Sequence, residues 1–144
     1  MNRIEQDLSY FPKILVNSSS PYYMTYIEGI VTNPHNNKKT MTVKKFIVDT
    51  GAAITILNSS FGFLFKDNDT PIIDQVNIHY GGGMTREPLP VYLIKLKIKG
   101  VEFEFPAAYD KNMQLTSLLG HFGFLNSLEH IGVSKQRKKL TLIK

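Results

Sequence analysis

The chain has 144 residues, of which 42% are hydrophobic and 20% are charged, a balance that is typical of a folded globular protein and excludes wholesale disorder. This length is enough for one domain with a buried core but too short for two domains of usual size. The formal net charge is +5, but the basic residues are spread along the chain, so nucleic acid is disfavoured as a partner, and the absence of cysteine excludes disulfides and thiolate chemistry.

Two further sequence features bear on location. A membrane-spanning helix needs about 20 consecutive apolar residues, and no run in this chain approaches that length. The first residues, Met1 to Asp7, are polar and do not resemble a secretory signal. We therefore expect no membrane span and a cytoplasmic protein.

The first third of the chain predicts a short arm followed by a β-hairpin. Residues 1–21 have mixed character and end in a Ser-rich loop, so they form either an N-terminal arm or an extra strand, and the domain proper covers 22–144. Residues 22–31 and 40–48 are rich in aromatic and β-branched side chains, which favours two strands joined by a polar turn. The second strand ends at Asp49.

The stretch around Asp49 is the most informative part of the sequence. Residues 46–48 and 53–57 have the composition of buried strands, so Asp49-Thr50-Gly51 is predicted to be a tight turn between them. Burying an ionised carboxylate without partners costs several kcal/mol or more, so this acid is hydrogen-bonded, paired or used in chemistry. Gly51 would give the turn backbone freedom and let another group approach closely.

The remaining elements predict more strands and little helix. Residues 58–60 can cap a short helical turn through 65, and 72–80 predicts a strand that runs into three glycines. Residues 88–99 and 101–105 alternate apolar with charged side chains, as half-buried paired strands do. Residues 121–128 favour a short amphipathic helix, and 130–134 and 140–143 are predicted to be the last strands. The sequence therefore predicts an all-β, closed or partly open barrel with one or two short helices.

The run Tyr80-Gly81-Gly82-Gly83 is a second candidate site. Three glycines produce a mobile segment whose backbone N–H groups can reach a ligand, as in a lid that excludes water. A plain hairpin turn is the structural alternative. A phosphate-binding loop is rejected, because no Gly-Lys-Ser/Thr follows.

Two motifs in this chain resemble those of the retropepsin-like aspartic proteases. Phe46-Ile47-Val48-Asp49-Thr50-Gly51-Ala52 is similar to their active-site motif, and Leu118-Leu119-Gly120 is similar to the later element that passes beneath the catalytic loop. The order and spacing of the two motifs fit that family. The resemblance covers roughly residues 22–143, and it implies that 22–144 is a protease domain of the acid-protease barrel type.

The resemblance also implies roles for individual residues. Asp49 would be catalytic, with Thr50, Gly51 and Ala52 supporting its loop. Tyr80 and the three glycines at 81–83 would belong to the flap that binds substrate, and Leu118, Leu119 and Gly120 would support the loop from below. The family often has an arginine after that glycine, and here His121 replaces it, which leaves no basis for a buried ion pair at this position.

Aspartic protease chemistry needs two carboxylates that share one proton. This chain contains a single Asp-Thr-Gly, so the second Asp49 would come from another copy across a two-fold axis. We therefore expect a homodimer acting on a peptide or protein substrate. In the family the terminal strands of the two subunits commonly interleave, and residues 138–144 are the segment expected to do so here.

Other chemistries have weaker support. The four histidines are far apart and lack metal-ligand spacing, so we expect no metal site and no cofactor. A glycosidase-type carboxylate pair stays open, although nothing singles out one of its candidates, which are Glu28, Glu87, Glu102, Glu104 and Glu129. The main alternative to an aspartic endopeptidase is an inactive barrel of the same ancestry that binds a peptide, a protein or nucleic acid.

Overall fold

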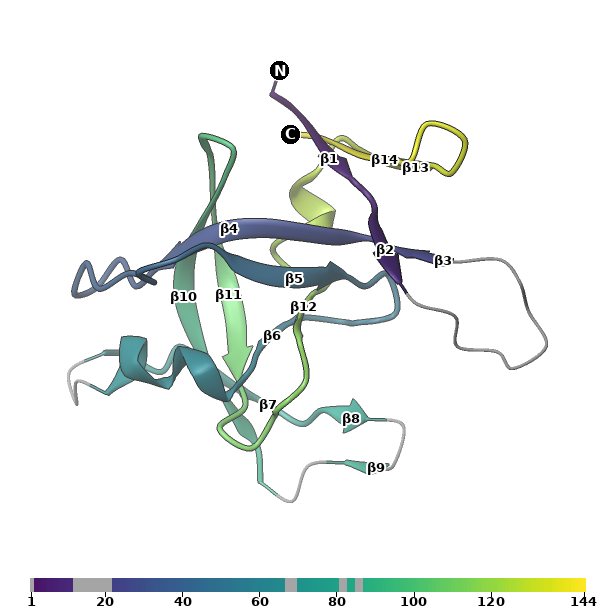
Figure 1. Cartoon of the computed structure of the whole chain (residues 1–144). Helices are drawn as coiled ribbons and strands as arrows, with labels where there is room; N and C mark the ends of the chain where they lie inside the picture. Colours follow the sequence, from purple (N-terminus) through teal and green to yellow (C-terminus); the bar gives the residue numbers. More distant parts are fainter. Residues whose placement is uncertain (1, 12–21, 67–69, 81–82, 85–86) are drawn as a thin grey trace.

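The computed structural model describes residues 2–11, 22–66, 70–80, 83–84 and 87–144. Within this part of the chain, strands predominate and both helices are short 3-10 segments (Figure 1). The strands are β1 (Arg3–Asp7), β2 (Ser9–Phe11), β3 (Tyr22–Met24), β4 (Tyr26–Thr32), β5 (Lys44–Val48), β6 (Thr55–Leu57), β7 (Asp74–Val76), β8 (His79–Tyr80), β9 (Gly83–Met84), β10 (Leu89–Ile98), β11 (Val101–Tyr109), β12 (Ser117–Leu119), β13 (His130–Ser134) and β14 (Lys139–Ile143). The helices are η1 (Ser59–Phe65) and η2 (Leu125–Ser127).

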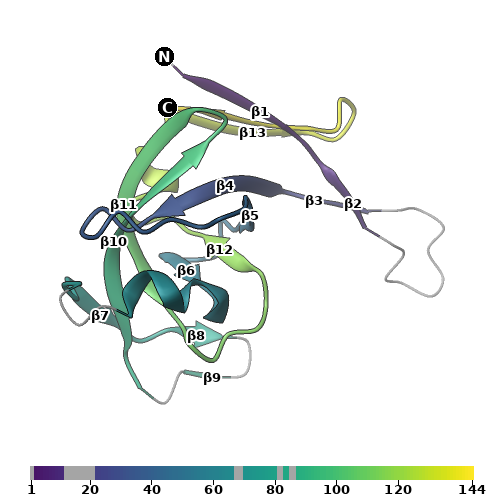
Figure 2. The ribbon, with the colours of Figure 1, turned by 60° about the vertical axis from the view of Figure 1, so that its left-hand side comes forward.

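Six strands close into a barrel. The pairing runs β11, β6, β12, β5, β4 and β10, and β10 pairs with β11 to complete the ring. Strand β7 adds to β10 outside this ring, and the curved β10–β11 hairpin forms one wall of the barrel (Figure 2). The predicted all-β barrel with short helices is therefore confirmed.

The β10–β11 hairpin shows how alternation builds this wall. Leu96 and Ile98 of β10 are fully buried, and the lysine between them is exposed. That residue, Lys97, pairs with Glu102 across the hairpin, and Lys95 pairs with Glu104. Cross-strand pairs of opposite charge contribute roughly 0.2–1 kcal/mol each. The predicted half-buried hairpin is confirmed, and β11 extends beyond the expected residue 105 because its last three residues pair with β6.

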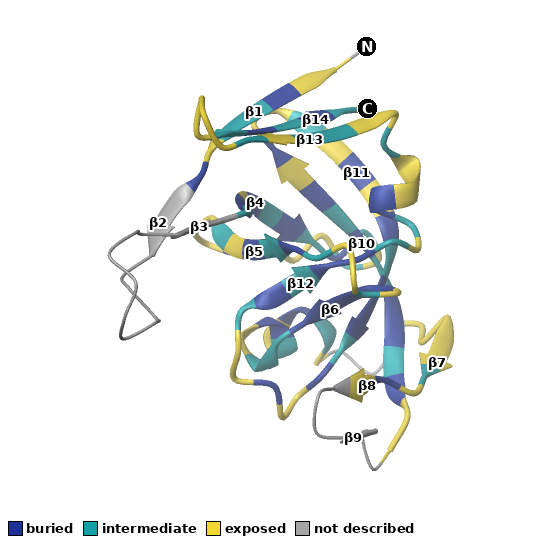
Figure 3. Ribbon diagram, turned by 90° about the vertical axis from the view of Figure 1, so that its right-hand side faces the viewer, coloured by how far each residue is buried: buried dark blue, intermediate teal, exposed yellow. Residues whose placement is uncertain are grey.

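A single large apolar cluster fills the barrel. Phe46, Phe61, Phe105 and Phe124 are each no more than 1% exposed, and their rings contact one another in pairs. Burying a side chain of this size contributes roughly 1.5–3 kcal/mol. Figure 3 shows the buried residues running along β10 while exposed residues gather at the turn between β13 and β14. Phe46 and Val48 of β5 belong to this core, so the core lies directly beneath the strand that leads to Asp49.

The two helices differ in how well the sequence predicted them. Asn58 caps η1, and its side-chain oxygen accepts the N–H of Ser60, as expected. The helix predicted for residues 121–128 is wrong except for the single turn η2. Gly123 has a φ of +83°, and a side chain there would lie 2.9 Å from the Cβ of Phe105. The chain bends at this glycine instead of starting a helix.

The strand predicted for 72–80 is interrupted. Within it, residues 74–76 form β7, which pairs with the start of β10, and residues 79–80 form the separate strand β8, which pairs with β9. Ile72 and Ile73 are half exposed and precede β7. The change of partner between β7 and β8 accounts for the interruption, because one straight strand cannot follow both β10 and the small hairpin.

The two ends of the described chain meet in a second sheet, which we call the terminal sheet and which consists of β1, β14 and β13 in that order. It lies above the barrel in Figure 1, with both termini on it. Ile4, Leu140 and Leu142 form its buried face and join the main core. The predicted strands at 130–134 and 140–143 are confirmed. The division of the chain at residue 21 stays a prediction, because residues 12–21 are outside the described part.

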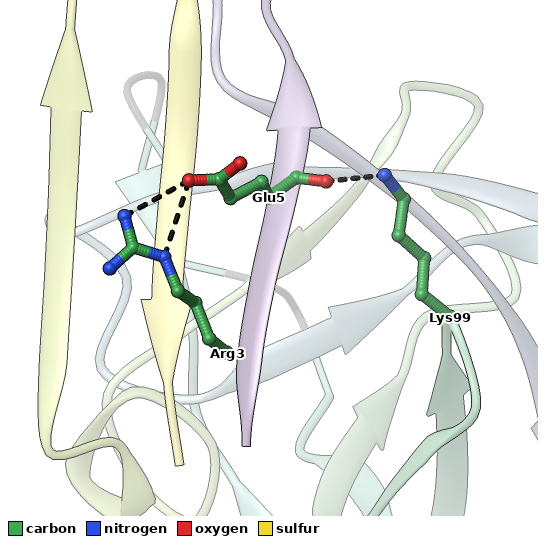
Figure 4. A network of polar contacts seen from close by, with 3 residues as sticks. All are labelled: Arg3, Glu5 and Lys99. Atoms are coloured by element: carbon green, nitrogen blue, oxygen red, sulfur yellow. Dashed lines mark hydrogen bonds and ion pairs between the residues drawn. The ribbon is translucent and has the colours of Figure 1, made fainter. Parts of the chain in front are cut away.

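Charged groups connect β1 to the rest of the terminal sheet and to the barrel. Lys99 at the β10–β11 turn donates to the Glu5 carbonyl, and within β1 itself the Arg3 guanidinium lies 3.0 Å from the Glu5 carboxylate (Figure 4). Lys139 of β14 forms an ion pair with Asp7. All these contacts are on the surface. Neither described helix has the length or the hydropathy of a membrane span.

Candidate active site

Asp49 follows directly after β5, which lies between β4 and β12 inside the barrel wall. The strand end is fixed from the β4 side, because the N–H of Val48 donates to the Thr25 carbonyl over 2.9 Å and the Thr25 hydroxyl donates to the Val48 carbonyl over 3.1 Å. Asp49 itself is half-buried. A rigid strand thus carries the carboxylate to the rim of the barrel.

The Asp-Thr-Gly segment forms the tight turn that the sequence predicts. The N–H of Gly51 donates to the Asp49 carboxylate oxygen Oδ1 over 2.8 Å, and the N–H of Ala52 donates to the Asp49 carbonyl over 3.1 Å. Gly51 is not among the residues with positive φ. Its role is the close approach, since a Cβ there would lie 3.2 Å from Oδ1. The expected need for unusual backbone freedom at Gly51 is therefore not observed.

The late Leu-Leu-Gly motif lies against the Asp49 turn, and the structure brings the two motifs together. Strand β12 runs parallel to β5, with Leu118 opposite Ile47 and Leu119 opposite Val48. The Leu119 carbonyl accepts the N–H of Asp49 over 3.0 Å. Parallel pairing places the ends of both strands at the same edge, so the backbone after Leu119 meets the backbone after Asp49.

Gly120 is required by packing. A Cβ at this position would lie 2.4 Å from the carbonyl of Ile54 and 2.9 Å from the oxygen of Ala52. The next two residues bind the same segment, because the N–H of His121 donates to the Ala52 carbonyl over 2.9 Å and the N–H of Phe122 donates to the Ala53 carbonyl over 2.8 Å. Only glycine lets the two backbones come this close.

Thr55 supports the site in a way that the sequence analysis missed. It is fully buried in β6, and its hydroxyl accepts the N–H of Gly120 over 3.1 Å. A hydroxyl in an otherwise apolar strand was the available signal, because a buried polar group needs a partner. Thr55 therefore connects the strand after the turn to the glycine beneath it.

His121 is the second residue that the sequence analysis missed. Its ring nitrogen Nε2 lies 2.6 Å from the Thr50 carbonyl oxygen. The sequence indicated only that the family's arginine is absent here, and the reach of the imidazole depends on the tertiary contact. Thr50 is exposed and contributes its carbonyl oxygen to this contact. A bracing role for the Thr50 hydroxyl stays a prediction.

The glycine hairpin is described only at its base. Tyr80 of β8 pairs with Gly83 of β9, and Gly81 and Gly82 lie outside the described residues. Ile78, just before β8, is buried in a small apolar cluster with Ile54, which follows the Asp49 turn. Figure 1 shows the β8–β9 hairpin at the end of the barrel away from the terminal sheet. Its function as a flap stays a prediction.

The described residues offer no group of three His, Cys, Asp or Glu side chains that could hold a metal ion. The group at this site that can take part in a reaction is the Asp49 carboxylate. It accepts one N–H, and its loop is hydrogen-bonded to the backbone that follows β12. A carboxylate of this kind can exchange a proton with water or with a substrate oxygen. A pair of them at one site would share a proton.

Comparison with solved structures shows that this chain, a closed barrel in which the Asp49 turn lies against Leu118-Leu119-Gly120, has the retropepsin-like fold. It is similar to a retropepsin-like aspartic protease from Rickettsia conorii, with 20% sequence identity and a TM-score of 0.56 over 98% of this chain and 89% of that one.

Viral proteases resemble the chain less closely. The protease of EIAV, solved with the inhibitor HBY-793, has 15% identity and a TM-score of 0.47 over 75% of this chain and 88% of that one. The simian foamy virus protease has 21% identity and a TM-score of 0.43 over 67% of this chain and 87% of that one. No family model and no curated protein matches the sequence.

Proposed function

We propose that this chain is an aspartic endopeptidase whose catalytic group is Asp49. The observation that carries this proposal is the braced turn, in which a half-buried Asp49 carboxylate accepts the N–H of Gly51 over 2.8 Å on a retropepsin-like barrel. The solved protein from Rickettsia conorii with this fold is named as an aspartic protease.

The proposed reaction uses two Asp49 carboxylates and one water. Two carboxylates about 3 Å apart cannot both ionise, so they share one proton. The ionised acid removes a proton from water, whose oxygen attacks the scissile carbonyl, while the protonated acid donates to the carbonyl oxygen. The tetrahedral intermediate then breaks its C–N bond. The nitrogen leaves with a proton from the dyad, and one hydroxyl of the intermediate returns its proton to the dyad as it becomes the carbonyl of the product acid. Titration of such a dyad belongs to the pair.

This chemistry requires a homodimer, because the chain has one Asp-Thr-Gly. The structure bears on how the copies would meet. Strand β14, expected to interleave with a partner, already pairs with β1 on one side and with β13 on the other. Among the described strands of the terminal sheet, the edges that remain unpaired are those of β1 and β13. Unpaired edges are the places where a second chain adds strands.

The proposed substrate is an extended peptide in a protein. The glycine hairpin at Tyr80 to Gly83 would cover it, with backbone N–H groups bonding the peptide and with bulk water excluded. The base of the hairpin packs on the barrel through a small buried apolar cluster that includes Ile54 and Ile78.

Asp49→Asn tests the proposal. Wild-type protein and the variant would be incubated with a mixed peptide library from acidic to neutral pH, and cleavage products would be counted by mass spectrometry. We expect Asp49→Asn to abolish cleavage, because an amide can neither share the proton nor activate water. The matched control is Asp74→Asn, an exposed aspartate at the start of β7, which should cleave as the wild type does.

Two results would contradict the proposal. If the wild type cleaves nothing, the chain is a barrel that binds without catalysis, and binding of library peptides would then identify it as such. If Asp49→Asn cleaves as fast as the wild type, the activity comes from another site. For nucleic acid as the ligand of such a barrel, affinity should fall steeply with salt.

A further inference from the structure

One peptide unit in the catalytic loop is bonded on both of its sides. The carbonyl of Thr50 contacts Nε2 of His121 over 2.6 Å, and the N–H of Gly51, which belongs to the same peptide unit, donates to Oδ1 of Asp49 over 2.8 Å. The described residues contain no cis peptide bond. In a trans peptide the C=O and the N–H point in opposite directions, so this unit lies between the imidazole and the carboxylate.

The chemistry of the contact fixes the direction of the hydrogen bond. A carbonyl oxygen only accepts, so His121 must carry a hydrogen on Nε2, either in the neutral ring or in the imidazolium. Hydrogen bonds that follow one another through a shared peptide unit polarise one another. A donor on the Thr50 carbonyl therefore makes the Gly51 N–H a stronger donor to Asp49, in addition to fixing its direction.

The position of the imidazole is set by the backbone that carries it. The N–H of His121 donates to the Ala52 carbonyl over 2.9 Å, and the His121 carbonyl accepts the N–H of Asn126 over 3.0 Å. Gly120 before it rests on Ile54. The side chain is half-buried and starts from a segment already bound to the loop, so little further ordering is needed for it to reach Thr50.

We propose that His121 is a positioning residue for Asp49, acting through the Thr50–Gly51 peptide unit. The imidazole donates to the carbonyl of this peptide unit, and the N–H of the same unit fixes one oxygen of the Asp49 carboxylate. The other oxygen is left for the partner carboxylate and the attacking water. This inference rests on the proposed function for its catalytic consequence, whereas the hydrogen-bond relay itself is a property of the free chain.

Two substitutions at His121 separate the effect of the hydrogen-bond donor from the effect of the imidazole ring. His121→Gln keeps an N–H donor at about the reach of Nε2, and His121→Leu removes the donor while filling similar space. One net hydrogen bond corresponds to roughly a tenfold rate effect. We expect His121→Leu to lower kcat on the order of tenfold with KM nearly unchanged, and His121→Gln to keep most of the wild-type kcat. His35→Leu, at an exposed histidine in the turn between β4 and β5, is the matched control and should change neither.

A second readout does not need activity. The amide proton of Gly51, followed by ¹H–¹⁵N NMR, should move upfield and exchange faster with solvent in His121→Leu, because its hydrogen bond to Asp49 weakens. His121→Gln and His35→Leu should keep the wild-type shift. If His121→Leu does not fold, His121→Met provides the same comparison, with a flexible apolar side chain that also lacks the donor.

The two readouts distinguish failure of this inference from failure of the proposed function. A wild type that cleaves nothing ends the protease assignment, and a moved Gly51 amide would still support the relay. An unchanged Gly51 amide in the variants without a donor overturns the inference whatever the cleavage rate. A loss of kcat in His121→Gln as large as that in His121→Leu also overturns it, because the ring and not the donor would then matter.

Discussion

The Asp49 loop and the terminal sheet differ in how far exposed charges contribute to their stability. Around Asp49 the bonds are mostly main-chain ones, with Leu119 and Gly120 packed onto the loop from inside the barrel. In the terminal sheet, β1 pairs with β14 through the main chain and buries Ile4, and exposed charges add to this contact, among them the Asp7 carboxylate, whose side chain is 77% exposed. Buried backbone contacts tolerate no change of shape but are insensitive to salt, whereas exposed ion pairs are screened by salt and tolerate substitution.

The largest effect is expected from Gly120→Ala, which would disrupt the backbone packing beneath the Asp49 loop. The added methyl would lie 2.4 Å from the Ile54 carbonyl group, and backbone cannot move away as the end of a side chain can. Overpacking of this kind costs roughly 1–3 kcal/mol and occasionally more. We expect a fall in the free energy of unfolding at the upper end of that range, measured by urea denaturation.

Gly62→Ala is the control for this prediction. Its methyl would meet the hydroxyl of Tyr109 at 2.5 Å, the far end of a side chain that can shift. The variant should therefore lose less stability than Gly120→Ala. Equal losses would show that contact with backbone is not what makes Gly120 indispensable.

A smaller effect is expected from low pH, which should destabilise the terminal sheet but not the Asp49 loop. The hydrogen bond from Lys139 lowers the pKa of Asp7 below its ordinary value of 3.8, and the hydrogen bond from Arg3 lowers the pKa of Glu5 below 4.5. A lowered carboxyl pKa means that the folded state favours the ionised form. The stabilisation is thus present above the ordinary pKa and is lost as the pH falls through the folded-state value.

Amide hydrogen exchange of β1 measures this effect. Exchange of residues 3–7, corrected for its intrinsic pH dependence, should accelerate slightly below pH 4 and in high salt, while the amides of β5 and β12 stay protected. In Asp7→Asn the part of this acid response that depends on Asp7 should disappear. If β1 and β5 respond to acid and salt alike, the two regions are not stabilised differently.

The sequence predicted the Asp49 turn and the barrel from local signals, because apolar residues flank Asp49 and alternation marks the β10–β11 hairpin. The place of Leu118-Leu119-Gly120 beneath that turn came from the resemblance to the retropepsin-like proteases and not from a local pattern. It did not predict that β1 would pair with β14, since the pairing of distant strands depends on the whole fold. His121 was missed for the same reason, because no local pattern shows which backbone carbonyl an imidazole will reach.

We propose that Asp49 is half of a site shared by two chains, and mixing wild-type and variant chains tests this. Wild-type chain at fixed concentration would be refolded together with increasing amounts of Asp49→Asn, and the cleavage rate would be followed. The rate should fall toward zero as mixed dimers with one carboxylate replace wild-type dimers. A cleavage rate that stays constant with excess variant would show that one copy of Asp49 suffices and that the site is not shared.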